Sequence, residues 1–164
     1  MPRARTKTSA RRAAARKPVK SRTKPANGAR KRAAPVKPSG QIFRVSHHSE
    51  EDFELGLRTY AKYRDLGMAK ATSGMVQAHV IRFVPPCRPE EVSKLHYHDV
   101  EFQMIYVLKG WIKTELEGQG PHVMRPGSAW IQPPRIKHKV LDYSDDAEVL
   151  EIVLPANFDT TELD

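Results

Sequence analysis

The alternation of apolar and polar residues changes at about Gly74, and the two sides of this point predict different elements. Before it, residues 49–66 begin with a serine and three acidic residues, which favour a helix N-terminus. Apolar side chains then recur at helical spacing, at Phe53, Leu57, Tyr60 and Ala61. We expect one short amphipathic helix that stops near Gly67 and packs on the outside of the remaining fold or at a subunit contact.

After Gly74 the pattern has a period of two residues, as in a half-buried β-strand. Residues 75–84 are rich in β-branched side chains and end at a Pro-Pro pair. Further short segments follow between glycines and prolines, at about residues 94–98, 101–108, 111–117, 122–125, 129–132, 137–141 and 148–154. Many short strands without intervening helices predict an all-β antiparallel sandwich or barrel. We expect the acidic residues 159–164 to fray.

Charge divides the chain as clearly as periodicity does. Residues 1–40 hold 14 of the 28 Lys and Arg and no Asp or Glu, so the net charge of +9 describes this segment and not residues 41–164. Five prolines and almost no large apolar side chain predict that the segment is disordered. A flexible polycation suits non-specific nucleic-acid binding through counterion release. A solvated extension, a misassigned start codon and an organellar transit peptide stay open as alternatives.

Cysteine content and apolar runs indicate the compartment. The single Cys87 excludes an intrachain disulfide, which fits a reducing environment. The longest apolar run, Met104 to Leu108, is far shorter than the roughly 20 residues of a membrane span. No apolar segment follows the N-terminal charges, as a secretory signal would require. We therefore expect a cytoplasmic protein without a membrane anchor.

Three histidines form the candidate chemistry. His96 and His98 are two residues apart on a predicted strand, so their side chains point to the same face. Antiparallel pairing with the strand around His138 would place a third imidazole beside them. Three convergent imidazoles with one further oxygen or nitrogen donor make a transition-metal site.

The same residues resemble the two motifs of the cupin family, H-x-H-x(3,4)-E-x(6)-G and G-x(5)-P-x-G-x(2)-H. The matching positions are His96, His98, Gly110, Gly127, Pro133 and His138, with Gln103 at the glutamate and Arg135 at the second glycine. The resemblance implies a jelly-roll (double-stranded β-helix) barrel of the small single-domain bacterial type at residues 75–158. Residues 41–74 would then be a linker and the short helix.

Two departures from the family pattern bear on the site. Gln103 replaces an anionic ligand with a neutral amide, which lowers the expected metal affinity and leaves a bound ion a stronger Lewis acid. Glu101 shares strand parity with Gln103 and is an alternative fourth ligand. Arg135 would place a cation near His138, where an anionic substrate could meet it. His79 and Tyr106 are further candidates for the substrate pocket.

The resemblance suggests three functions that the sequence does not separate. The first is a mononuclear metal-dependent dioxygenase, isomerase or lyase, with Fe, Mn, Ni, Cu or Zn, that acts on a small oxygenated molecule. The second is a barrel that binds or senses a small molecule without turnover. The third is a platform on which residues 1–40 contact nucleic acid. A homodimer is expected, because such barrels expose a sheet edge that a second copy can pair.

Overall fold

The computed structural model describes residues 40–56 and 58–163. The predicted basic tail, residues 1–40, lies outside the described residues apart from Gly40. The fold set out below belongs to the compact unit Val36–Asp164. Within its described part, no helix is long and apolar enough to cross a membrane.

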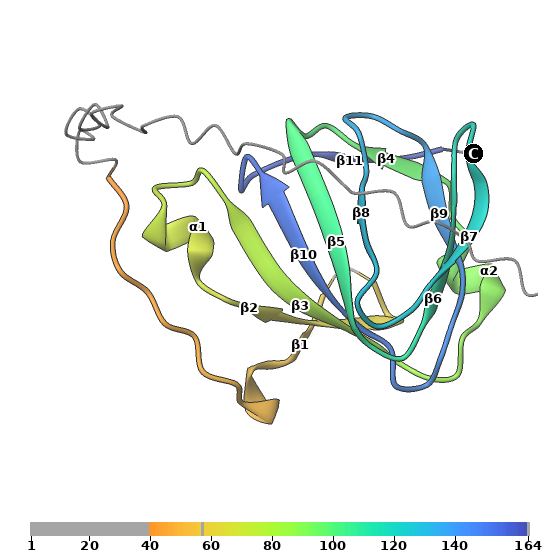
Figure 1. Ribbon diagram of the computed structural model, residues 1–164, viewed down its shortest axis with the longest axis horizontal. Helices are drawn as coiled ribbons and strands as arrows, with labels where there is room; N and C mark the ends of the chain where they lie inside the picture. Colours follow the sequence, from red (N-terminus) through yellow and green to blue (C-terminus); the bar gives the residue numbers. More distant parts are fainter. Residues whose placement is uncertain (1–39, 57, 164) are drawn as a thin grey trace, which may run out of the picture. The chain divides into compact units, whose positions relative to one another are not determined.

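Two antiparallel sheets face each other around a common interior (Figure 1). The first sheet has the strand order β1 (Glu54–Leu55), β2 (Ala61–Asp65), β3 (Gln77–Phe83), β10 (Glu148–Leu154), β5 (Phe102–Lys109) and β8 (Ala129–Ile131). The second has the order β11 (Thr160–Glu162), β4 (His96–His98), β9 (His138–Tyr143), β6 (Ile112–Leu116) and β7 (Gly120–Met124). The helical segments are short: η1 (Glu50–Asp52), α1 (Met68–Ala71) and α2 (Pro89–Val92). The predicted all-β antiparallel jelly-roll is confirmed.

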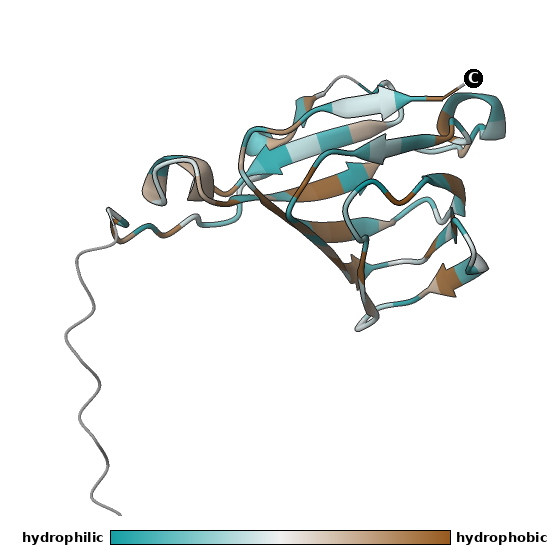
Figure 2. Cartoon of the chain, turned by 90° about the horizontal axis from the view of Figure 1, so that it is seen from above, coloured by the Kyte–Doolittle hydropathy of each residue, from teal (hydrophilic) through white to brown (hydrophobic). Residues whose placement is uncertain are grey.

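The strands expected from the period-two pattern are all present. β3 to β10 differ from the predicted segments by at most two residues at either end. Several of them carry long hydrophobic stretches, drawn brown in Figure 2. The side chains of β5 alternate as a half-buried strand requires, because Gln103, Ile105 and Val107 are buried and lie on one face.

The hydrophobic core lies between the two sheets. Its buried members are Phe83, Val92, Ile105, Val107, Ile112, Tyr143, Ala147 and Val149. The Phe83 and Tyr143 rings lie 4.7 Å apart between centroids, and the Tyr143 hydroxyl donates to the carbonyl of Val84 over 2.8 Å. Burying a side chain such as Val107 stabilises the fold by about 1.5–3 kcal/mol relative to leaving it in water. The strands that form this core also carry the polar residues of the interior.

Gly110, a residue of the family motif, makes the turn between β5 and β6. Its φ is +63°, in the left-handed region that favours glycine. A Cβ built there would lie 2.9 Å from the Cα of Ala147. Both the backbone conformation and the close approach therefore require glycine at this position.

The helix predicted over residues 49–66 is wrong. The segment contains the single turn η1 and the strands β1 and β2, and β2 pairs with β3 from Ala61 opposite Phe83 to Asp65 opposite His79. The apolar residues span too few turns to separate a helix from a strand, and pairing with the edge of the sheet prevails over local preference. Gly56 leaves room for the ring of Tyr63, which packs over it.

The acidic C-terminal residues do not fray as predicted. Thr160, Thr161 and Glu162 form β11, which pairs antiparallel with β4. Backbone bonds from Asp99 to Asp159 (3.0 Å) and from Leu163 to Leu95 (2.8 Å) extend this pairing. The sheets thus run from Glu54 to Glu162, beyond the predicted limits of residues 75 and 158.

Candidate metal centre and its cavity

Strands β4 and β9 bring three imidazoles together, as the spacing predicts. His96 and His98 lie on one face of β4, and His138 is the register partner of His96. The ring centroids are 4.3 Å apart for His96 and His138, and 5.1 Å apart for each pair that includes His98. One ring nitrogen of each residue lies within 4.8 Å of the others. These distances suit three ligands of one metal ion.

A hydrogen bond at Nδ1 fixes the orientation of each ring. Nδ1 of His96 lies 2.8 Å from the carbonyl oxygen of Lys94, and Nδ1 of His138 lies 2.9 Å from that of Ile136. A carbonyl oxygen only accepts, so in the neutral rings Nδ1 carries the proton and Nε2 has the free lone pair. Nδ1 of His98 lies 2.8 Å from Oγ1 of Thr160, a hydroxyl that can accept the same bond. Such bonds are typical of metal-binding histidines.

Burial keeps the three imidazoles in the neutral form that binds metal. It lowers the pKa of His98 and of His138 to about 4, and repulsion between the neighbouring rings lowers both further. Burial also lowers the pKa of His96. At neutral pH all three rings are therefore neutral, and Nε2 of His96 and of His138 is available as a ligand atom.

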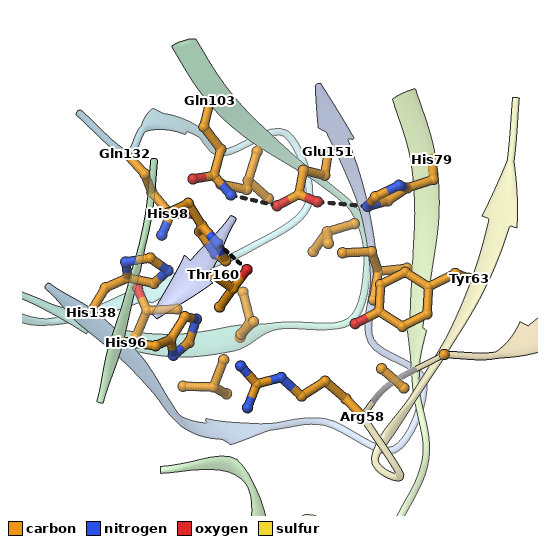
Figure 3. A pocket seen from close by; sticks show the side chains of 18 of the residues that line it. Arg58, Tyr63, His79, His96, His98, Gln103, Gln132, His138, Glu151 and Thr160 are labelled. Carbon is orange, nitrogen blue, oxygen red and sulfur yellow. Dashed lines mark hydrogen bonds and ion pairs between the residues drawn. The ribbon is translucent and has the colours of Figure 1, made fainter. Parts of the chain in front are cut away.

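A row of buried polar groups continues from the imidazoles across the first sheet (Figure 3). The Nε2 of Gln103 donates to Oε1 of Glu151 over 2.6 Å. The other carboxylate oxygen, Oε2, lies 2.6 Å from Nε2 of His79. Burial opposes the charge on Glu151, but the bonds from His79 and Gln103 outweigh it and hold the pKa of the carboxyl below its usual range. The amide of Gln103 thus turns its carbonyl oxygen away from Glu151, where it is free to act as a ligand.

A cavity of about 330 Å³ adjoins the imidazoles and the buried row. Its wall is largely apolar, with aromatic side chains from several strands, and the labelled polar side chains reach it from several directions (Figure 3). The apolar wall residues include Ile81, Phe83, Ile105, Ile112, Trp130, Val140, Val149 and Phe158. An apolar cavity with a few convergent polar groups is the usual form of a small-molecule site.

Of the residues predicted for the substrate pocket, His79 lines the cavity and three others do not. Glu101 precedes β5 in an exposed bend, where the parity of the strand does not apply. Glu101 does not line the cavity, so its position does not suit the role of fourth metal ligand in place of Gln103. Tyr106 is on the outer face of β5, since it alternates with the inward Ile105 and Val107, and its side chain is 38% exposed.

Arg135 also lies outside the cavity, and its position explains the glycine of the family pattern. Its φ is +62°, and its N–H donates to the carbonyl of His98 over 3.0 Å, which ties the turn to β4. The guanidinium turns outward, where Nη2 donates to the Tyr97 hydroxyl over 3.2 Å. The Arg135 guanidinium therefore lies outside the cavity that the three imidazoles line, and its contact with a substrate stays a prediction.

Sequence reasoning missed other polar residues of the cavity. Glu151 is a lone acid in the middle of the apolar segment E-V-L-E-I-V-L, on the inward face of β10, and this contrast is a usable signal. Arg58 lies in the segment that the pattern predicts to be a helix, and Thr160 lies in the end that it predicts to fray. Both line the cavity.

Comparison with solved structures finds similar folds. KdgF from Halomonas sp. is 21% identical with a TM-score of 0.54, and the match covers 68% of this chain and 96% of that one. The polyketide cyclase RemF from Streptomyces resistomycificus is 17% identical with a TM-score of 0.61, over 75% and 87% of the chains. Oxalate decarboxylase from Bacillus subtilis is 18% identical with a TM-score of 0.55, and the match covers 77% of this chain but 34% of that one. Identities this low show a shared fold and not a shared activity.

Comparison with protein families gives the assignment. No curated protein matches the chain. The family model described as a cupin domain matches residues 87–153, which contain both motifs and all three histidines of the candidate metal centre. The match, the jelly-roll topology and the motif residues agree, and they identify residues 87–153 as a cupin domain.

Proposed function

We propose that this protein is a metal-dependent cupin enzyme that acts on a small oxygenated molecule. The supporting observation is the arrangement of His96, His98 and His138, whose Nδ1 atoms are all hydrogen-bonded and whose Nε2 atoms border one cavity. A metal held from one side by protein nitrogens keeps coordination positions for substrate on the other side. The cavity would supply the space for that substrate.

The donor set is chemically suited to a divalent transition ion. Three imidazoles with the carbonyl oxygen of Gln103 fit Fe, Mn, Ni, Cu or Zn. All four donors are neutral, so the ion would keep its full charge and act as a strong Lewis acid towards an enolate- or carboxylate-like oxygen. Gln103 is 2% exposed, which makes it a fixed part of the wall.

In this proposal, Glu151 and His79 handle a proton. They form a hydrogen-bonded acid–base pair whose side chains are 12% and 13% exposed, and both line the cavity. A paired carboxylate and imidazole can accept a proton from a bound substrate and return it at another atom. The pair favours isomerase or lyase chemistry, with a dioxygenase as the second candidate.

The remaining wall would select an oxygenated molecule. Among the described residues, Oγ1 of Thr114 and Nε1 of Trp130 are buried without a hydrogen-bond partner, and both residues line the cavity. Buried polar atoms without partners are costly, and oxygen atoms of a ligand would satisfy them. The apolar wall would exclude water and so strengthen each of these contacts.

Metal analysis is the first test. Protein purified without chelating resin should contain about one equivalent of a transition metal by elemental analysis, and His96→Ala with His98→Ala should abolish it. His122→Ala, at an exposed position on β7, is the control. Unchanged metal in the double variant would contradict the proposal.

Turnover separates an enzyme from a binding or sensing barrel. Water-proton relaxation with Mn(II) bound should reveal exchangeable water, which indicates open coordination positions, and a substrate screen with an oxygen electrode should then find turnover. A closed four-coordinate site without water would favour the non-catalytic alternative. Oxygen uptake during turnover would favour the dioxygenase.

The basic tail supports a separate proposal, non-specific nucleic-acid association. Its support is the concentration of Lys and Arg in residues 1–40. Full-length protein should bind DNA with an affinity that falls steeply with salt, and a variant lacking residues 1–40 should not. Equal binding by both forms would exclude this role.

A homodimer in a reducing, cytoplasmic compartment completes the proposal. The outward side chains of the first sheet form apolar cross-strand rows, with Ile152, Met104 and Ile131 in one and Leu150 and Tyr106 in the next. A second copy laid on this face would cover it by two-fold symmetry. Sedimentation analysis should show a dimer that Ile131→Lys weakens, and a monomer in the wild type would contradict it.

A further inference from the structure

Arg58 brings a positive charge to the cavity that the proposed chemistry has not used. It lies in the connection between β1 and β2, lines the cavity together with the three imidazoles, and has a side chain that is 17% exposed. Figure 3 shows its guanidinium on the same side of the cavity as His96. Besides burial, the charge of Arg58 contributes to the lowered pKa of both His96 and His98.

No acidic side chain of the cavity wall forms an ion pair with Arg58 among the described residues. Apart from histidines, Glu151 is the one other lining residue with a formal charge among the described residues, and its two oxygens are bonded to Gln103 and His79. The partner of Arg58 is Glu162 of β11, 2.8 Å from Nη1. The Glu162 side chain is 53% exposed and is absent from the cavity wall.

An exposed partner of this kind is held weakly. A surface ion pair contributes little because water and salt screen it, and Glu162 uses one nitrogen of the guanidinium. The planar guanidinium can bind a second carboxylate through two parallel hydrogen bonds, and such bonds are shorter and stronger where water is excluded. The interaction with Glu162 therefore keeps the side chain in place while leaving donors for a ligand.

We propose that Arg58 is an anion subsite of the cavity, on the side of His96, and that the substrate is a small carboxylate that also carries a second oxygen function. The carboxylate would bind the guanidinium of Arg58, and the hydroxyl, keto or enol oxygen would face the three imidazoles. This inference rests on the proposed metal site, because the second oxygen function would face the imidazoles. Beyond the proposed function, it specifies that the substrate is negatively charged and that Arg58 selects it.

Two chemical probes that differ in one group test the subsite. 2-Oxoglutarate and 2-oxovalerate share a keto-acid end that can chelate a metal, and differ in a terminal carboxylate or methyl group. Titration calorimetry on metal-loaded protein should give a dissociation constant at least about tenfold lower for 2-oxoglutarate. The preference should shrink with added salt, since part of it is electrostatic.

Substitutions of Arg58 and Glu162 then test whether Arg58 causes the preference for 2-oxoglutarate. Arg58→Gln should remove it, and Arg58→Lys should keep part of it, because the charge remains and the planar fork is lost. Glu162→Gln should preserve or increase it, by less than about fivefold, because the competing carboxylate is gone. Arg88→Gln, at an exposed arginine paired with Glu91, is the matched control and should change nothing.

The outcomes separate this inference from the proposed function. Equal binding of the two probes, or a preference that survives in Arg58→Gln, would overturn the subsite while full metal occupancy leaves the metal proposal standing. Absence of bound metal in the wild type would overturn both. Loss of the preference in Arg58→Gln, with metal content and thermal unfolding unchanged, supports the subsite.

Discussion

Gln103 donates an Nε2–H to Oε1 of Glu151 over 2.6 Å, and this bond determines which end of the amide is free. An ionised carboxylate only accepts, so the amide nitrogen must face Glu151. The carbonyl oxygen is left for the side of the imidazoles. The neutral residue at position 103 and the anion at position 151 therefore act as one unit, in which the negative charge lies one hydrogen bond behind the proposed ligand.

Removing the charge at position 151 should weaken metal binding. In Glu151→Gln the new amide can donate or accept, so it no longer dictates the orientation of Gln103, and the nearby negative charge is lost. We expect the metal affinity to fall by about 10- to 100-fold, as for other residues that orient metal ligands. Competition with a chromogenic chelator measures this.

The matched control is Glu148→Gln on the same strand. Glu148 pairs with Arg82 and does not line the cavity, so its loss should leave the metal affinity unchanged. Equal affinities in the wild type and Glu151→Gln would show that Glu151 does not orient the amide.

Restoring the family's glutamate at position 103 should strengthen metal binding and lower the thermal stability of the metal-free protein. Gln103→Glu replaces a donor to Glu151 with a second carboxylate in a buried site, and the two charges repel. We expect a lower midpoint of thermal unfolding without metal, and a larger increase on metal addition than in the wild type, because the ligand gains a charge. Differential scanning calorimetry with and without metal tests both. An unchanged apoprotein midpoint would argue against the coupling.

Acid should destabilise the metal-free protein before the carboxyls titrate. The pKa values of His98 and His138 are lowered from 6.5 to about 4, so between these values the unfolded chain binds more protons than the folded one. Stability is then fully present above pH 6.5 and falls as the pH drops towards 4, by up to about 1.4 kcal/mol per pH unit for each ring. Urea unfolding in the presence of a chelator, from pH 7.5 to 4.5, measures the slope.

His98→Ala should reduce this slope, since one of the two strongly shifted groups is gone. The exposed His122→Ala should leave it as in the wild type. A flat dependence between pH 6.5 and 4.5 in the wild-type apoprotein would mean that the rings are not held neutral by burial.

The sequence was sufficient where a local pattern determines the structure. Strand alternation placed His96 and His98 on one face, and the motif spacing identified His138, which the structure sets opposite His96. It failed where a contact distant in sequence decides. Residues 53–61 have apolar side chains at helical spacing, but residues 61–65 pair with the edge of β3 as a strand. Residues 160–162 look like a polar end, but β4 offers them a partner.

The site follows the same division. The motif spacing identified Gln103, but its hydrogen-bond partner Glu151 comes from β10, and the partner of Glu151, His79, comes from β3, both far away in the chain. Arg135 at a glycine position suggested a cation beside the metal, because the sequence does not tell that φ is positive there and that the side chain turns to Tyr97. The cation of the cavity is Arg58, in a segment assigned to the wrong element.

The glycine that ends β5 allows a comparison of conformational strain with steric crowding. Gly110 and Gly118 both have positive φ, +63° and +75°, but a Cβ at Gly110 would lie 2.9 Å from the Cα of Ala147, whereas at Gly118 nothing lies within 4 Å. Gly118→Ala should cost about 1 kcal/mol of unfolding free energy from the left-handed backbone alone. Gly110→Ala should cost about 1–3 kcal/mol more, since backbone atoms must also move. Urea unfolding of the two variants measures the difference, and equal losses would mean that the turn accommodates the methyl group without displacing Ala147.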